Sequence, residues 1–198
     1  MLYKTKYKKK SAGFTMIEVV IALFVLTVAV IGVYNAFSIM AVATAQMSDR
    51  FTAAYLAQEG IEIIRNMRDN NWLKDPQVDW TAGLLCGSPP CHWQADYTTG
   101  TSAPGAFPLQ DWSGNDETGG SHLNINSNSF YYYDLSNPNE TKFRRKITID
   151  SVKNIANETI ALKVSATVFW EEKPNIVNID FPAQPGSITA EDYLYNWY

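Results

Sequence analysis

The sequence predicts an α+β fold in which a long N-terminal α-helix packs on a C-terminal antiparallel β-sheet. Three features lead to this prediction. An apolar run begins at Phe14, helical spacing of apolar residues continues without proline as far as Asn70, and the spacing changes to two after Ser129. Such a sheet leaves one apolar face to be covered, and the long helix is available to cover it.

The amino-acid composition limits the classes of function that this chain can have. A chain of 198 residues with 46% apolar and 18% charged residues has the composition of a folded domain with an additional element. The net charge of −4 conceals an asymmetry, because residues 1–13 hold five lysines and no acid, which leaves 11 basic and 20 acidic side chains elsewhere. This acidic body disfavours nucleic acid as a partner, since binding along a phosphate backbone requires a basic surface.

Residues 14–45 are predicted to cross a membrane once. Glu18 is the only charged side chain between Phe14 and Ser48, and a membrane-spanning helix needs about 20 predominantly apolar residues. The lysines that precede the span should stay on the cytoplasmic side. We therefore expect a single-pass protein of the cytoplasmic membrane whose residues 46–198 are exported.

Two simpler interpretations of this segment remain open. A secretory signal peptide fits the basic N-terminus and the small residues Ala41, Ala43 and Ala45, but its apolar core is about 7–15 residues long, and this run is about twice that. An uncleaved anchor explains the length but not Glu18, because an ionised carboxylate inside a membrane costs about 2.5–3.5 kcal/mol. Proximity to the positive end of the helix dipole lowers that cost.

The residues around Glu18 form a pattern. A lysine-rich leader is followed by Gly13-Phe14-Thr15-Met16-Ile17-Glu18-Val19. Over about the first 35 residues the chain resembles type IV prepilins and type II secretion pseudopilins. The resemblance implies that residues 1–13 are a cytoplasmic leader, that prepilin peptidase cuts between Gly13 and Phe14, and that the new amine of Phe14 is methylated.

Each position of this pattern has a chemical reason. Glycine lacks a Cβ, so a protease can reach the backbone. The new α-amine has a reference pKa of about 7.7–8.0 and is mostly charged at neutral pH. The resemblance implies that Glu18 pairs with the amine of a neighbouring subunit, which offsets the cost of a buried carboxylate. The implied partners are prepilin peptidase, other pilin or pseudopilin subunits and the inner-membrane assembly platform.

Residues 46–71 are predicted to form the amphipathic second half of the helix. A stripe of apolar residues at three- and four-residue steps is expected in the core: Phe51, Ala54, Tyr55, Ile61, Ile64 and Met67. Met47, Phe51 and Tyr55 could equally line a partner groove. Gly32 and Gly60 are the positions at which the helix is expected to bend most easily. Many major pilins carry a helix-bending proline in the apolar half, and its absence here argues mildly against a major subunit.

The segment from Leu56 to Trp72 gives a second resemblance, to the helix end of PilV-type minor pilins. Residues 72–129, which follow it, have the composition of a variable loop region. The run Cys86-Gly-Ser-Pro-Pro-Cys91 favours a disulfide, which in so small a ring contributes about 2 kcal/mol. Zinc held by both cysteines and His92 is the alternative, although the paired Cys-x-x-Cys spacing is missing.

Acidic and amide side chains gather between residues 111 and 120. This set consists of Asp111, Asn115, Asp116 and Glu117. Oxygen ligands on a flexible loop could bind calcium, and some pseudopilins do so. The spacing does not match an EF-hand, and a solvated acidic loop is the favoured interpretation.

Residues 130–198 are predicted to form an antiparallel β-sheet and a C-terminal tail. Residues 130–135 indicate a first strand, and the alternation over 143–149 and 160–168 indicates two more. Residues 176–179 hint at a fourth strand. Arg144 and Arg145 are expected on an exposed face.

The chain shows no catalytic signature, and neither an enzymatic activity nor a cofactor is expected. We interpret it as a structural subunit, a minor pilin of a type IV pilus or related filament. A type II secretion pseudopilin is the alternative within this class. The alternative of another class is a bitopic membrane-anchored exported binding domain.

Overall fold

The structure, a computed structural model, describes residues 13–74, 78–101, 106–115, 119–134, 140–171 and 185–196. Its single long helix α1 runs from Met16 to Lys74. The chain divides into two compact units, Met1–Ala43 and Thr44–Tyr198, which are described separately below.

The described part of the first unit is the apolar portion of α1. Its large apolar side chains are exposed. The apolar stretch of α1 that is long enough to cross a membrane contains no buried residue. Two of its hydroxyl groups are satisfied within the helix. The hydroxyl of Thr27 donates to the carbonyl of Leu23 at 2.7 Å, and that of Ser38 donates to the carbonyl of Tyr34 at 3.1 Å. Hydroxyl groups that bond to the backbone of their own helix suit a membrane interior.

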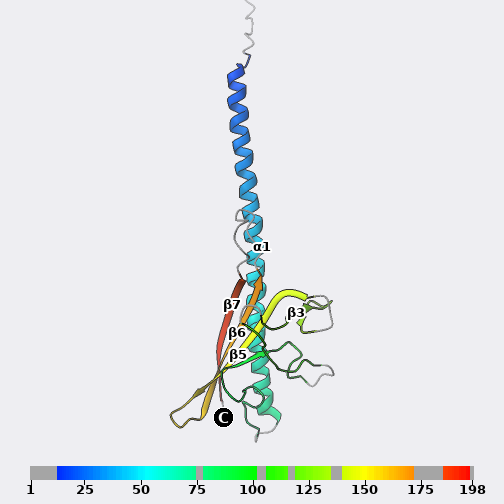
Figure 1. Cartoon of the computed structure of the whole chain (residues 1–198), viewed down its shortest axis with the longest axis vertical. Helices are drawn as coiled ribbons and strands as arrows, with labels where there is room; N and C mark the ends of the chain where they lie inside the picture. Colours follow the sequence, from blue (N-terminus) through cyan, green and yellow to red (C-terminus); the bar gives the residue numbers. More distant parts are fainter. Residues whose placement is uncertain are drawn as a thin grey trace, which may run out of the picture. The chain divides into compact units, whose positions relative to one another are not determined.

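Among the described residues, the second unit contains the remainder of α1 and seven β-strands (Figure 1). These strands are β1 (Cys91–Gln94), β2 (Gln110–Asp111), β3 (His122–Ile125), β4 (Tyr131–Tyr132), β5 (Glu140–Lys153), β6 (Thr159–Glu171) and β7 (Pro185–Tyr195). All described pairings are antiparallel. Strand β5 is central: it pairs with β6 along one edge and with β1 and β3 along the other, and β7 extends the sheet beyond β6. The predicted α+β fold is confirmed.

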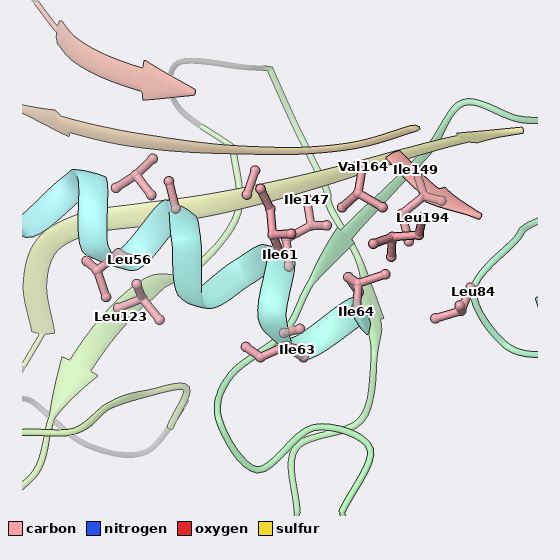
Figure 2. Packing of buried hydrophobic residues seen from close by; sticks show 14 of the residues in the cluster. Leu56, Ile61, Ile63, Ile64, Leu84, Leu123, Ile147, Ile149, Val164 and Leu194 are labelled. Carbon is pink, nitrogen blue, oxygen red and sulfur yellow. The ribbon is translucent and has the colours of Figure 1, made fainter. Parts of the chain in front are cut away.

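The hydrophobic core lies between α1 and one face of the sheet. Figure 2 shows Leu56, Ile61 and Ile64 of the helix together with apolar side chains of the strands. The strand residues come from register pairs such as Ile149 with Val164, which places alternate residues of neighbouring strands on the same face. Because successive strand residues point to opposite faces, this register determines which alternate residues of each strand face the helix.

Gly60 marks a close approach of α1 to the sheet. A Cβ at this position would lie 3.0 Å from the Cβ of Ala166 and 3.1 Å from the Cδ of Arg145. The helix continues without interruption through both Gly32 and Gly60. Gly60, at which a bend was expected, is therefore a packing contact, for which the missing side chain leaves the room.

Two expectations about the faces of these elements were wrong. Phe51 and Tyr55 are 66% and 71% exposed, because the buried stripe is shifted toward smaller residues. The buried apolar residues of the helix are Ala53, Leu56, Ala57, Ile61, Ile63 and Ile64. Arg144 and Arg145, which were expected on an exposed face, are both buried. Arg145 alternates in phase with the core residues Phe143 and Ile147 and so points toward the helix.

The sheet differs from expectation in its short strands and its last strand. Strands β1, β2 and β3 lie inside the stretch expected to be loops. Strand β7 pairs with β6 from Pro185 to Tyr195, where a tail was expected. The hinted strand at 176–179 lies outside the described residues. So does the end of the strand expected at 130–135, of which the structure describes Tyr131–Tyr132 as β4.

Candidate processing and assembly site

Two residues, Phe14 and Thr15, lie between the predicted cut and the start of the helix at Met16. The hydroxyl oxygen of Thr15 accepts a hydrogen bond from the backbone N–H of Glu18 at 3.3 Å, and the carbonyl of Thr15 accepts one from the N–H of Val19 at 3.3 Å. Thr15 is therefore the N-cap residue. The spacing Thr15-x-x-Glu18 is that of a capping box, a pattern that is present in the sequence itself. Glu18 thus occupies a position that favours both the helix start and a negative charge.

The backbone before the cap is open. Gly13 precedes the helix, and a Cβ built there would meet nothing within 4 Å. Phe14 is 81% exposed. The fold of the described residues thus places no steric demand for glycine at position 13, so any such demand comes from the enzyme that cuts the chain.

The carboxylate of Glu18 is exposed on the first turn of α1. Within the part of the chain that the structure describes, no ion pair involves it. The carboxylate is therefore open to a cation from another molecule.

Cys86 and Cys91 form a disulfide with a Cα–Cα distance of 5.7 Å. Cys91 opens β1 and pairs in register with Ile149 of the central strand, so the bridge secures the chain as it enters the sheet. The indole N–H of Trp93 donates to the carbonyl of Leu84 at 3.0 Å and fastens the same segment. Both sulfurs are used by the disulfide, and the His92 ring lies 3.1 Å from the Thr148 hydroxyl. The structure thus does not assemble the alternative zinc ligand set.

The acidic segment that was considered for calcium is only partly described. Asp111 ends β2 with an exposed side chain, whereas Asp116 and Glu117 lie outside the described residues. The N–H of Gly119 donates to the carbonyl of Asn115 at 2.7 Å, so backbone bonds hold this turn. The described part of this segment adds no support for calcium binding.

A buried polar cluster around Arg145 was not foreseen. The Arg145 guanidinium donates to the carbonyl of Leu56 at 2.9 Å, to the carboxylate of Glu59 at 2.8 Å and to the carbonyl of Ala95 at 2.6 Å. The Tyr133 hydroxyl donates to the carbonyl of Arg145 at 3.2 Å. Burial raises the pKa of Tyr133 to about 12, against a smaller lowering by the Arg145 charge. The cluster ties α1 to the sheet and offers no open site for a substrate.

Comparison with protein families identifies one motif. The prokaryotic N-terminal methylation motif matches residues 8–34, which include the Gly13–Phe14 bond, Thr15 and Glu18. No curated protein and no solved structure matches the chain.

The motif and the fold together define the class. The chain is a prepilin-type protein, with an apolar helix near its N-terminus that fits a membrane anchor. Within that class the motif supports a type IV pilin-like protein, either a pilin-type or a pseudopilin subunit. The motif implies processing by prepilin peptidase and assembly with other pilins.

Proposed function

We propose that this protein is a minor pilin, an accessory structural subunit of a type IV pilus or related filament, and not an enzyme. Prepilin peptidase would cut between Gly13 and Phe14 and methylate Phe14. The subunit would wait in the cytoplasmic membrane with its second unit exported, until the assembly platform inserts it into the filament.

The single observation that carries this proposal is the arrangement at the start of α1. The chain places an exposed carboxylate, Glu18, one turn after a capped helix start and directly before an uncovered apolar helix. In a simple anchor this carboxylate would serve only to favour the helix start, whereas an assembly surface would also use its charge. The charged amine of a neighbouring Phe14 would neutralise Glu18 and set the depth at which the two helices pack.

The minor-pilin assignment has two supports. The helix α1 runs from Met16 to Lys74 with no proline, unlike many major pilins, and residues 56–72 resemble the helix end of PilV-type minor pilins. Both supports concern the helix, which is the part of the subunit that enters the filament core.

The test compares incorporation of the wild type with that of Glu18→Ala and Glu18→Gln. Glutamine keeps the capping-box geometry and approximate size but removes the charge. A buried charge left alone costs about 3–5 kcal/mol. Because about 1.4 kcal/mol corresponds to a tenfold change, the amount of either variant in sheared filaments should fall by two to three powers of ten. Cleavage after Gly13 and membrane levels should stay normal. Normal incorporation of both variants would refute the assembly role and favour an anchored binding domain.

A further inference from the structure

Strand β7 forms an edge of the sheet in the unit Thr44–Tyr198. Among the described residues it pairs only with β6, so no described strand lies along the other side of its backbone. The edge is 11 residues long, from Pro185 to Tyr195. An edge strand presents a row of backbone N–H and C=O groups to which a further strand can bind, unless other groups cover or interrupt the row.

The register of β6 and β7 shows which residues of β7 direct their backbone groups outward. The N–H of Asn196 donates to the carbonyl of Ile160 at 3.3 Å, and the register continues from Ala161 with Tyr195 without a shift. In an antiparallel pair, residues that bond to the neighbouring strand alternate with residues that do not. Even-numbered residues of β7 therefore bond to β6, and odd-numbered residues direct their N–H and C=O groups to the open edge.

Both ends of this edge are closed. The carbonyl of Tyr195 accepts a hydrogen bond from the Arg68 guanidinium at 3.5 Å, and the N–H of Tyr193 donates to the carboxylate of Asp192 at 2.8 Å. Both bonds use outward groups of odd-numbered residues, as the alternation requires. At the other end, Pro185 has no N–H to donate. The outward backbone groups that bond to no described residue belong to the window between these ends: Ser187, Thr189 and Glu191.

A groove with a volume of ≈520 Å³ lies beside this window, between β7 and α1. Strand β7 lines it with residues 190–192. The helix contributes a stripe of residues at three- and four-residue steps: Tyr55, Gln58, Glu62 and Arg65. The first three of these side chains are exposed. A strand added to β7 would therefore have helix side chains along one of its faces.

The lining of the groove carries an excess of negative charge. Arg65 forms ion pairs with both Glu62 and Asp192, so one guanidinium serves two carboxylates. The other two carboxylates of the lining, those of Glu59 and Glu191, each have a cation of their own. The lining thus holds one negative charge more than these cations neutralise. Complementary charge favours a binding partner with lysine or arginine side chains.

We propose that the β7 edge at residues 187–191 binds an extended, lysine- or arginine-bearing segment of another polypeptide as an added strand. In this mode main-chain hydrogen bonds supply affinity, and alternate side chains supply specificity. Because strand side chains alternate between faces, one set lies against the helix at Tyr55 and Glu62, and the other lies beside Glu191. A cationic side chain meets a carboxylate on either face. This edge is separate from the N-terminal assembly helix and does not rest on the proposed function.

Peptides of defined sequence test the edge on the full-length protein in non-ionic detergent. The probe is fluorescently labelled Lys-Val-Lys-Val-Lys-Val-Lys, whose cations share one face of a strand. Two matched probes separate strand pairing from simple charge attraction. One has the same sequence with every backbone nitrogen methylated, and the other has glutamate in place of lysine. Fluorescence anisotropy should show that the wild type binds the lysine probe more tightly than either matched probe, by about tenfold or more.

Variants of Thr189 locate the binding on β7. Thr189→Pro removes the outward N–H in the middle of the window and places a ring there, without removing a backbone bond to β6. It should weaken binding of the lysine probe about tenfold. Thr189→Val is the control: it loses only the hydroxyl, which lies 2.9 Å from that of Thr167, and it should bind like the wild type. Thermal unfolding verifies that each variant is folded, and the methylated probe makes the same comparison on wild-type protein.

Three results would overturn the proposal. The first is that the wild type does not bind the lysine probe, or binds its methylated form equally well. The second is equal binding of the lysine probe to folded Thr189→Pro and to Thr189→Val. The third is association of wild-type copies in sedimentation velocity that Thr189→Pro abolishes, which would assign the edge to a second copy of this chain. Because no filament takes part in these measurements, none of the three results bears on the proposed function.

Discussion

Arg145 of β5 and Glu59 of α1 form an ion pair with a distance of 2.8 Å, in which the arginine side chain is completely buried and the glutamate side chain is 30% exposed. The same guanidinium also donates to the carbonyls of Leu56 and Ala95. A single side chain thus joins the helix, the central strand and the segment after β1. A buried arginine is costly unless its charge and donors are satisfied. Here three acceptors bind its two terminal nitrogens, whereas its buried Nε has no hydrogen-bond partner among the described residues.

Replacement of Arg145 should be strongly destabilising. Arg145→Met leaves two buried carbonyls and one carboxylate without their donor, and we expect a loss of about 3–5 kcal/mol in the free energy of unfolding. Thermal unfolding of the full-length protein in detergent would measure this. Arg65→Met is the control, because Arg65 bonds Asp192 at 2.6 Å in a partly exposed pair, and this variant should lose no more than about 1 kcal/mol. Equal losses in both variants would contradict the role of Arg145.

Tyr133 should make stability depend on pH in the alkaline range. Its pKa is raised from 10.0 to about 12 because burial disfavours the phenolate, so the folded state holds the proton more tightly than the unfolded state. The resulting stability is present below pH 10 and is lost as the pH rises from 10 to 12, at up to about 1.4 kcal/mol per pH unit. Chemical unfolding at pH 9, 10 and 11 would show this slope.

Tyr133→Phe is the matched variant for that measurement, since other groups also titrate in this range. It removes the hydroxyl that bonds the carbonyl of Arg145 and should be less stable at pH 9. The difference between the two proteins should shrink as the pH rises. A constant difference from pH 9 to pH 11 would show that Tyr133 does not titrate in the way described.

The sequence predicted the long helix, its apolar first half and the antiparallel sheet, because each depends on local periodicity. It predicted the burial of Ile61 and Ile64 on the helix, but not that of Ala53 and Ala57. Ala53 and Ala57 carry little hydrophobic signal, yet their small size lets the helix approach the sheet, whereas Phe51 and Tyr55 stay exposed. Arg145 was misplaced because its charge was given more weight than its position in the alternation. Strand β7 was missed because Asp192 interrupts its apolar side, where Arg65 of the helix neutralises it.

For the site, the sequence itself shows the N-terminal motif that the comparison matches over residues 8–34, because the motif is local. Gly13, Phe14 and Glu18 are recognised by order and spacing alone. The groove beside Tyr55 could not be foreseen, since its other side comes from β7, far along the chain. Only the folded arrangement brings the two together.

Gly186→Ala should weaken the attachment of β7. A Cβ at this position would lie 2.3 Å from the Cε2 atom of the buried Trp170 ring, which is its register partner on β6. Overpacking of this kind costs about 1–3 kcal/mol. Gly87→Ala is the control, because a Cβ there would meet nothing within 4 Å. Thermal unfolding should separate the two variants, and equal melting temperatures would contradict the packing described.

The disulfide should be present in protein taken from cells. Alkylation under non-reducing conditions, followed by mass spectrometry, should label neither Cys86 nor Cys91. The double variant Cys86→Ala/Cys91→Ala should lose about 2 kcal/mol of stability, because the bridge closes a small ring and restricts the unfolded chain little. Quantitative labelling of both thiols would show that the bridge does not form in the cell.

Cleavage after Gly13 is the prediction that bears most directly on the maturation of this protein. The mature chain should begin with methylated Phe14, which mass spectrometry of the N-terminal peptide would establish. Because a side chain at position 13 meets nothing within 4 Å in the described structure, Gly13→Val should leave the fold intact and still block or strongly slow the cut. Thr15→Ala is the matched control: it removes the helix cap, at a cost of about 1 kcal/mol, without altering the bond that is cut. Its cleavage should therefore remain near normal. A mature chain beginning at Gln46 would show instead that ordinary signal peptidase removes the apolar segment, and no assembly helix would then remain.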